Sequence, residues 1–114
     1  MDYLPDIEVI FYMNDSRKTA AFDGYRPSHQ INGLYLTSGV HHYYFTGKLE
    51  PNSYALGAIK FITPEYYPHC LFVGKTIEFQ EGERIVGKAI VLRIINKKLL
   101  QKGCENSAQV PVVE

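Results

Sequence analysis

The stretch that decides the fold is EFQEGERIVGKAIVLRIIN, residues 78–96. It begins with a polar turn, residues 80–83, and continues as a long apolar run that a glycine interrupts. The turn composition predicts a hairpin in which Gly82 takes a positive φ angle. A glycine inside a strand is typical of a bulge or a sharp corner, so we expect one at Gly87. The stretch therefore predicts a hairpin whose second strand bends.

Further segments of the chain also favour strands. Residues 7–13 alternate so that four apolar side chains share one face, which is the period of a strand. Other strands are expected at about 29–37, 40–47, 56–62, 70–79 and 83–96, separated by turn residues. This spacing, without a helical period, predicts an all-β barrel or sandwich. We expect one domain over residues 1–97 and a flexible tail over 98–114, because the tail is polar and unpatterned.

Composition and charge narrow the class of protein. The chain has 114 residues, of which 46% are hydrophobic and 21% charged, as in a soluble one-domain protein. Twelve basic and twelve acidic residues cancel, whereas nucleic-acid-binding domains are usually basic. The sequence begins without a signal-peptide pattern, and no apolar run approaches the ~20 residues of a membrane span. We therefore expect a cytoplasmic protein that does not bind membranes.

The residue types that carry catalysis or bind metals form no convincing pattern. VGKT at residues 73–76 is similar to the end of a phosphate-binding loop, but the glycine needed five residues before Gly74 is His69. His41 and His42 are adjacent, so in a strand they point to opposite faces and cannot share a metal. His69 and Cys70 diverge in the same way. We expect no catalytic residues, metal, cofactor or nucleotide.

Three motifs resemble those of a known family. FDGYRP, residues 22–27, is similar to the Gly-Tyr-Arg-Pro motif in the third domain of elongation factor Tu and its relatives. Residues 74–87 match the family's closing pattern of a glycine, a strand, an acid–glycine turn, a basic residue and Val-Gly. PDIEVIFYM, residues 5–13, resembles its first strand. The resemblance covers roughly residues 5–96 and implies a closed six-stranded antiparallel β-barrel.

The resemblance also implies functional surfaces. In the family, the Gly-Tyr-Arg-Pro turn and the last hairpin lie at surfaces of a domain that contacts the T-stem backbone of aminoacyl-tRNA and packs on a GTPase domain. The resemblance therefore implies four candidate binding residues. Tyr25 and Arg26 lie in the turn, and Arg84 and Lys88 lie in the hairpin and the strand after it. Structural roles are the alternative, because Tyr25 can cap the core and Arg84 can pair with an acid across the hairpin.

The chain departs from the family at several of these positions. Gln80 and Thr76 stand where the family often has basic residues, and Ala89 replaces a glycine. Phosphate binding depends on Lys and Arg, so these losses weaken an expectation of tRNA binding. The sequence in hand contains no counterpart of the family's GTPase domain, so we expect no nucleotide switch.

The middle of the chain, residues 28–70, does not match the family and contains many tyrosine and histidine residues. Tyrosine is favoured at binding hot spots because it brings a large amphipathic area at low entropic cost. We expect several side chains in this part to lie outside the core and to bind a partner: His41, His42, Tyr43, Tyr66 and Tyr67.

Three functions remain open from the sequence. The preferred hypothesis is a non-enzymatic module that binds a protein partner, for example an immunity or antitoxin protein that neutralises a toxin acting on tRNA or translation. The alternative is a tRNA- or RNA-binding module that keeps the family's partner through basic residues and tyrosine stacking. A small enzyme on a barrel scaffold is the third and least favoured hypothesis.

Overall fold

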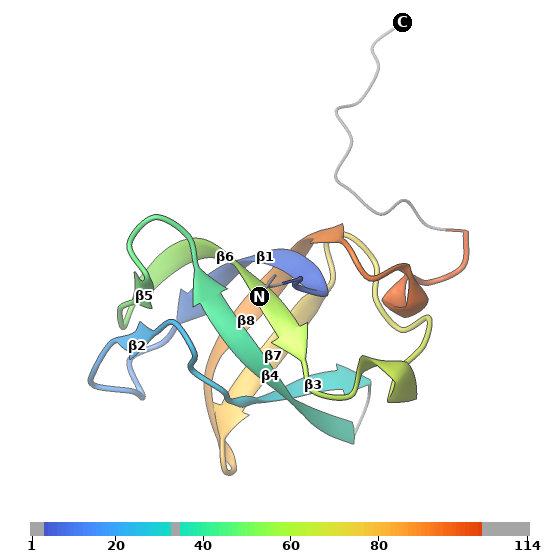
Figure 1. The fold of residues 1–114 in the computed structure, drawn as a ribbon. Helices are drawn as coiled ribbons and strands as arrows, with labels where there is room; N and C mark the ends of the chain where they lie inside the picture. The colour runs from blue at the N-terminus through green and yellow to red at the C-terminus, as the bar shows by residue number, and fades with distance from the viewer. Residues whose placement is uncertain (1–3, 33–34, 104–114) are drawn as a thin grey trace, which may run out of the picture.

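Six strands of the computed structural model close into a barrel (Figure 1). The model describes residues 4–32 and 35–103. Around the barrel the strand order is β1–β6–β4–β3–β7–β8, and β8 pairs with β1 to close it. Every pairing is antiparallel, which confirms the predicted barrel. The strands are β1 Ile7–Met13, β3 Ser28–Asn32, β4 Tyr35–Tyr43, β6 Ser53–Phe61, β7 Thr76–Glu81 and β8 Arg84–Ile94.

Four short elements lie outside the barrel wall. Strands β2 (Ala21–Phe22) and β5 (Lys48–Leu49) form a two-stranded sheet beside one end of the barrel (Figure 1). Two 3₁₀ helices, η1 (Pro64–Tyr66) and η2 (Lys97–Leu99), lie close together at the other side of the picture. The described part of the chain has no helix with the length and hydrophobicity needed to cross a membrane.

The core of the barrel follows the alternation predicted for β1. Ile7, Val9, Phe11 and Met13 are fully buried, and the residues between them face outward with partial exposure. The interior is filled mainly by large side chains that come from different strands, among them Phe11, Phe61 and Phe79. The period-2 pattern is therefore enough to place this strand in a closed barrel.

The β7–β8 hairpin has the geometry that the opening stretch predicts. Gly82 has a φ angle of +60° at the turn. The register shifts between Phe79 and Gln80, which leaves Val86 as an extra residue next to Gly87. A Cβ atom at Gly87 would collide with the carbonyl oxygen of Tyr12 and with the Phe79 ring. Glycine is required there because a backbone and an aromatic ring approach it closely.

The strand boundaries in the middle of the chain differ from the prediction. The segment expected as one strand over 29–37 contains the end of β3 and the start of β4, which pair with each other. The Asn32-Gly33 pair is a hairpin signal that falls between them. The strand expected over 70–79 starts only at Thr76, because residues 67–75 form a connection instead.

The end of that connection, Lys75, bridges the place where β3 and β7 separate. These strands share only two paired positions, Ser28 with Gln80 and His29 with Phe79. Beyond them the Lys75 ammonium group enters the gap and donates to the carbonyl oxygens of Ile31 at 3.2 Å and Cys70 at 2.8 Å. A side chain therefore supplies hydrogen bonds where strand pairing stops.

The predicted boundary between barrel and tail is too early. Leu99 is fully buried, although it lies within the segment expected to be flexible. Its carbonyl oxygen accepts from the backbone N–H of Leu71 at 2.8 Å, and the N–H of Gln101 donates to the Leu71 carbonyl at 2.7 Å. The packed part of the chain thus extends through η2, and the rest of the expected tail, residues 104–114, lies outside the described residues.

Candidate functional site

The structure joins the Gly-Tyr-Arg-Pro turn to the last hairpin. The Tyr25 hydroxyl donates to Glu81 Oε2 at 2.5 Å across 56 residues of sequence. Arg17 Nε bonds to the same oxygen at 2.9 Å, and Arg84 bonds to Oε1 at 2.7 Å. The Arg17 guanidinium also lies 5.0 Å from the centre of the Tyr25 ring. Two motifs that are distant in sequence therefore meet around one carboxylate, Glu81.

The electrostatics of this cluster favour an ionised Glu81. Burial alone would raise its pKa, but the hydrogen bonds from Tyr25, Arg84 and Arg17 outweigh burial and lower it. Burial and the bond to Glu81 raise the pKa of the Tyr25 hydroxyl, so it stays protonated and donates. Arg84 is thus paired with an acid of its own hairpin, which is the structural alternative set out for it.

The other two predicted basic residues lie apart from this pairing. Arg26 is exposed next to Tyr25, beyond the turn. Lys88 projects from the outer face of β8, with its Nζ atom 5.8 Å from the centre of the Tyr12 ring on β1. The structure therefore brings Tyr25 and Arg84 together and leaves Lys88 on a different surface.

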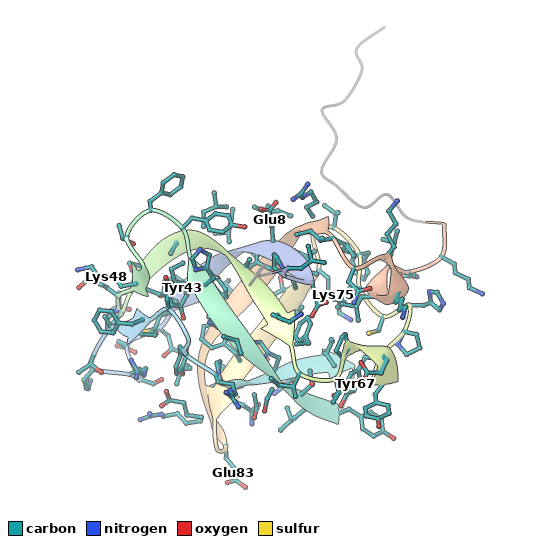
Figure 2. The ribbon with its side chains drawn as sticks, in the orientation of Figure 1. Glu8, Tyr43, Lys48, Tyr67, Lys75 and Glu83 are labelled. Atoms are coloured by element: carbon teal, nitrogen blue, oxygen red, sulfur yellow. The ribbon has the colours of Figure 1, made fainter. Side chains whose placement is uncertain are left out.

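Charges at this end of the barrel cancel. The loop before β3 carries three basic side chains against two acidic ones, and the hairpin tip carries one against two. Glu83 projects from the tip, away from the barrel (Figure 2). Equal numbers of opposite charges give no concentrated positive potential for a phosphate backbone. The residues counted are Asp15, Arg17, Lys18, Asp23, Arg26, Glu81, Glu83 and Arg84.

Two of the residues expected on a binding surface are instead in the core. His41 and Tyr43 are 0% and 1% exposed, because from Thr37 onward the odd-numbered residues of β4 face the barrel interior. His29 from β3 is also 0% exposed, and its Nε2 atom lies 2.8 Å from His41 Nε2. The expectation that His41 and Tyr43 lie outside the core is therefore wrong. These residues form an internal polar chain.

The direction of the hydrogen bonds in this chain follows from its ends. The Thr37 carbonyl can only accept, so His29 Nδ1, at 3.1 Å, carries a proton and donates to it. A neutral imidazole has one N–H, so His29 Nε2 accepts from His41 Nε2. His41 Nδ1 then accepts from the Tyr43 hydroxyl at 2.8 Å. Every ring nitrogen of the pair has a partner when both rings are neutral.

Burial keeps this chain neutral. It lowers the pKa of His29 to about 4, although the hydrogen bond to Thr37 acts in the opposite direction. Burial also lowers the pKa of His41 well below its ordinary value, and the neighbouring His29 adds to the effect. Burial raises the pKa of the Tyr43 hydroxyl, with a further contribution from Tyr25. All three side chains are therefore uncharged near neutral pH.

Partly and fully exposed aromatic side chains gather on the outer face of β1 and β6 and on the turn after β4. Tyr12 and Tyr54 pair across β1 and β6, with ring centres 4.9 Å apart, and Ile10 pairs with Leu56 in the adjoining row. The backbone N–H of Tyr44 donates to the Leu56 carbonyl at 2.9 Å. Tyr54 is 65% exposed. We call this surface the aromatic face and define it as Ile10, Tyr12, Tyr44, Phe45, Tyr54 and Leu56.

Phe45 is the most unusual member of the aromatic face. It is 94% exposed, and its φ angle of +68° lies in a region that bulky side chains rarely adopt. Its ring centre lies 6.4 Å from that of Tyr44. Such a conformation costs on the order of 1–3 kcal/mol of folding free energy. Because the ring is exposed, it buries almost no apolar area that could offset this cost. Phe45 thus contributes little to the fold while its backbone is strained.

Charged groups hold the aromatic face in place. The Glu8 carboxylate, on the outer side of β1, accepts from the Tyr44 hydroxyl at 2.6 Å and from Arg93 at 2.9 Å (Figure 2). His42 packs its ring 5.4 Å from that of Tyr44 and lies 3.2 Å from Asp23. His42 is therefore the predicted site residue that does lie beside the aromatic face.

Tyr66 and Tyr67 lie at the far end of β4 from this face. Tyr66 is exposed on η1, and the Tyr67 hydroxyl donates to the Leu36 carbonyl near the start of β4 at 3.3 Å. Leu36 and Tyr44 are separated by eight residues of extended chain, or roughly 26 Å at the rise of a β-strand. The predicted tyrosines therefore do not form one patch with His42.

The residues that sequence reasoning missed are Tyr12, Tyr54 and Phe45. The outward position of Tyr12 was readable from the alternation in residues 7–13. Tyr54 was missed because β6 begins at Ser53 rather than at the predicted position 56. No sequence pattern indicates the positive φ of Phe45, because phenylalanine rarely adopts it.

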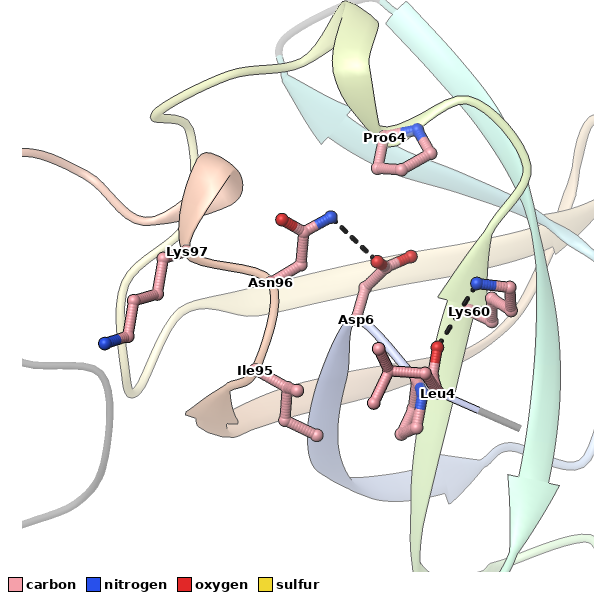
Figure 3. A pocket seen from close by; sticks show the side chains of 8 residues that line it. Leu4, Asp6, Lys60, Pro64, Ile95, Asn96 and Lys97 are labelled. Carbon is pink, nitrogen blue, oxygen red and sulfur yellow. Dashed lines mark hydrogen bonds between the residues drawn. The ribbon is translucent and has the colours of Figure 1, made fainter. Parts of the chain in front are cut away.

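An open hollow of about 520 Å³ lies where β1 begins and β8 ends (Figure 3). Asp6 is buried in its wall and accepts from Asn96 Nδ2 at 2.9 Å and from the Phe61 N–H at 2.7 Å. Lys60 donates to the Leu4 carbonyl at 3.2 Å, and Lys97 points away from Asp6. The hydrogen bonds of Asp6 join the ends of strands, so this residue has a structural role in the wall of the hollow.

Residues able to bind a metal do not converge in the described part of the chain, where no three His, Cys, Asp or Glu side chains form a group. Comparison with protein-family models finds no match, and comparison with curated proteins finds none either.

Proposed function

We propose that this protein is a non-enzymatic module that holds a protein partner against the aromatic face. Phe45 carries the proposal: its ring is 94% exposed on a backbone with φ of +68°. The backbone at Phe45 turns the chain after β4, but the exposed ring at the tip of that turn buries nothing, which supports a role for the ring in a contact. Aromatic residues grouped in one patch are also the commonest anchors of protein interfaces.

Charge distribution supports a protein over tRNA as the partner. Arg84 and Arg17 are both paired with Glu81, so neither guanidinium is held ready for a phosphate. Opposite charges are equal in number around them, and the whole chain has a net charge of zero. Without a basic surface, the electrostatic gain that dominates binding to a nucleic-acid backbone is small.

The chemistry of the face defines the partner that it fits. Tyr12, Tyr54 and Leu56 offer apolar area, and Lys88 stands over Tyr12 at the rim. We expect the partner to present an apolar patch with an acidic side chain facing Lys88. A toxin that the protein neutralises, or a component of translation, remains the candidate class that follows from the sequence.

The test is capture of the partner by purified protein from its native cells at moderate salt. Wild type should retain one stoichiometric protein, and Phe45→Ser and Tyr54→Ser should each weaken binding at least about 30-fold, as expected for hot-spot aromatics. Tyr35→Ser is the matched control, because Tyr35 is 68% exposed, like Tyr54 at 65%, but lies outside the aromatic face.

Three results would count against the proposal. Recovery of tRNA alone, with a gel shift that weakens in salt and on Arg84→Ala, would favour the nucleic-acid alternative. Equal loss of binding with Tyr35→Ser would show that the contact is not specific to the aromatic face. A concentration-dependent dimer broken by Tyr54→Ser would identify a second copy of this chain as the occupant.

A further inference from the structure

Strand β4 connects the internal polar chain to the aromatic face. His41 and Tyr43 point into the barrel, whereas His42 is partly exposed on the opposite side of the strand. Tyr44 follows directly and belongs to the aromatic face. Any movement of β4 that changes the internal chain therefore changes the position of side chains on the outer surface.

Among residues 4–32 and 35–103, no counter-charge lies at bonding distance from a protonated histidine in the interior. Aromatic rings enclose the pair: Phe11 lies 4.3 Å and Phe79 4.9 Å from the His41 ring, and Phe61 lies 5.5 Å from that of His29. All four imidazole nitrogens are already bonded within the chain that runs from the Thr37 carbonyl to the Tyr43 hydroxyl. A charge placed there is desolvated without an ion pair.

The titratable groups around the pair are engaged elsewhere. On the loop before β3, Asp23 Oδ1 accepts from the Tyr43 N–H at 2.7 Å, and its other oxygen faces His42. The Tyr25 ring stands 5.5 Å from that of His41, but its hydroxyl points to Glu81 of β7. Arg17 lies over the Tyr25 ring and also bonds to Glu81.

Adding one proton disrupts the whole chain. If His29 Nε2 gains a proton it must donate, so His41 Nε2 must accept and move its own proton to Nδ1. His41 Nδ1 then donates to the Tyr43 oxygen, and the Tyr43 hydroxyl proton loses its acceptor. Protonation therefore costs both the desolvation of a charge and a buried hydrogen bond.

We propose that the His29–His41–Tyr43 chain is an acid-sensitive latch for the aromatic face. Proton uptake by the chain loosens β4 from the barrel interior, and the partner bound to the outer surface is released. The release step rests on the proposed function, whereas the loosening of β4 does not.

The sign and size of the effect follow from proton linkage. An exposed imidazole titrates near pH 6.5, and His29 in the closed barrel near 4, so the opened form binds more protons at acid pH. The closed form keeps its full stability above about pH 6.5 and loses it as the pH falls towards 4. Between pH 7.5 and 5, His29 alone shifts the opening equilibrium on the order of 30-fold.

Hydrogen exchange tests the loosening directly on the whole protein. After correction for the intrinsic pH dependence of exchange, protection of residues 35–44 should fall at least 30-fold between pH 7.5 and 5. His69→Gln is the matched control, since it removes an exposed imidazole that lies outside β4, the latch and the aromatic face, and it should keep the wild-type profile. His29→Gln should reduce the change, because it removes one of the two buried titrating groups.

Nitrogen NMR of the wild-type imidazoles keeps the test independent of how well the variants fold. At pH 7.5 it should show His29 protonated on Nδ1 and His41 on Nε2, and this pattern should disappear together with the protection of β4. Unchanged protection of residues 35–44 at pH 5, or a profile abolished by His69→Gln, would overturn the latch. Loosening of β4 without release of a captured partner would leave the latch standing and contradict only its link to the aromatic face.

Discussion

Gly87 determines how closely β8, β1 and the Phe79 ring can approach one another. The position has no side chain, and a Cβ atom there would meet the Tyr12 carbonyl oxygen and the ring together. Because the oxygen belongs to the backbone of a neighbouring strand, it cannot move aside without disturbing the closure of the barrel. One residue thus fixes the packing at the β1–β8 seam.

We expect Gly87→Ala to lower the free energy of unfolding by roughly 3 kcal/mol or more, because an inserted methyl group must displace backbone. Urea denaturation followed by circular dichroism measures this change. Gly82→Asn is the control: asparagine tolerates the φ of +60° at the turn, so it should cost less than about 1 kcal/mol. A loss for Gly87→Ala no larger than that of the control would contradict the packing described.

At the scale of elements, the seam between β3 and β7 depends on a side chain. These strands diverge after two paired positions, and Lys75 bridges the gap through the carbonyl oxygens of Ile31 and Cys70. A barrel whose wall is completed in this way is expected to open first where the bridge stands, since backbone pairing is absent there.

Replacing Lys75 by methionine keeps most of the length of the side chain and removes its donors. We expect Lys75→Met to reduce stability by about 1–3 kcal/mol, because two partly buried carbonyl groups lose a partner. Hydrogen exchange should show the loss first in residues 28–31. Lys60→Met, which removes an exposed bond to the Leu4 carbonyl, should change stability by less than about 0.5 kcal/mol. Equal effects of the two substitutions would exclude a bridging role.

At the scale of the whole molecule, the barrel is completed by chain that follows its last strand. Leu99 is fully buried, and backbone bonds join residues 99 and 101 to Leu71. The segment 67–75 is therefore held from both sides, by Lys75 within it and by η2 from outside.

Truncation separates this contribution from the rest of the chain. A protein ending at Asn96 should lose about 3 kcal/mol or more, because it loses a buried leucine and the bonds to Leu71. A protein ending at Gly103 retains all the described contacts and should be more stable than the protein ending at Asn96 by that amount. If both truncated proteins matched the full chain in calorimetry, η2 would not belong to the folded unit.

Local patterns in the sequence determined the parts of the fold that depend on near neighbours. The alternation in residues 7–13 placed β1 correctly, and the Glu81-Gly82 turn predicted the hairpin and its positive φ. Both follow from strand period and turn chemistry, which act over a few residues. The number of strands and the closed barrel were predictable for the same reason, together with the resemblance of the motifs.

Tertiary structure alone decided which face of β4 is buried. The sequence led us to expect His41 and Tyr43 outside the core, yet the barrel buries the face with Thr37, His41 and Tyr43. That choice is stable because His29, from another strand, completes the hydrogen bonds that His41 needs. The aromatic face arises in the same way, from residues of β1, β6 and the turn after β4 that only the closed barrel brings together. The sequence pattern of a strand shows which of its residues share a face. A site also depends on side chains from other strands, and only the tertiary structure brings these together.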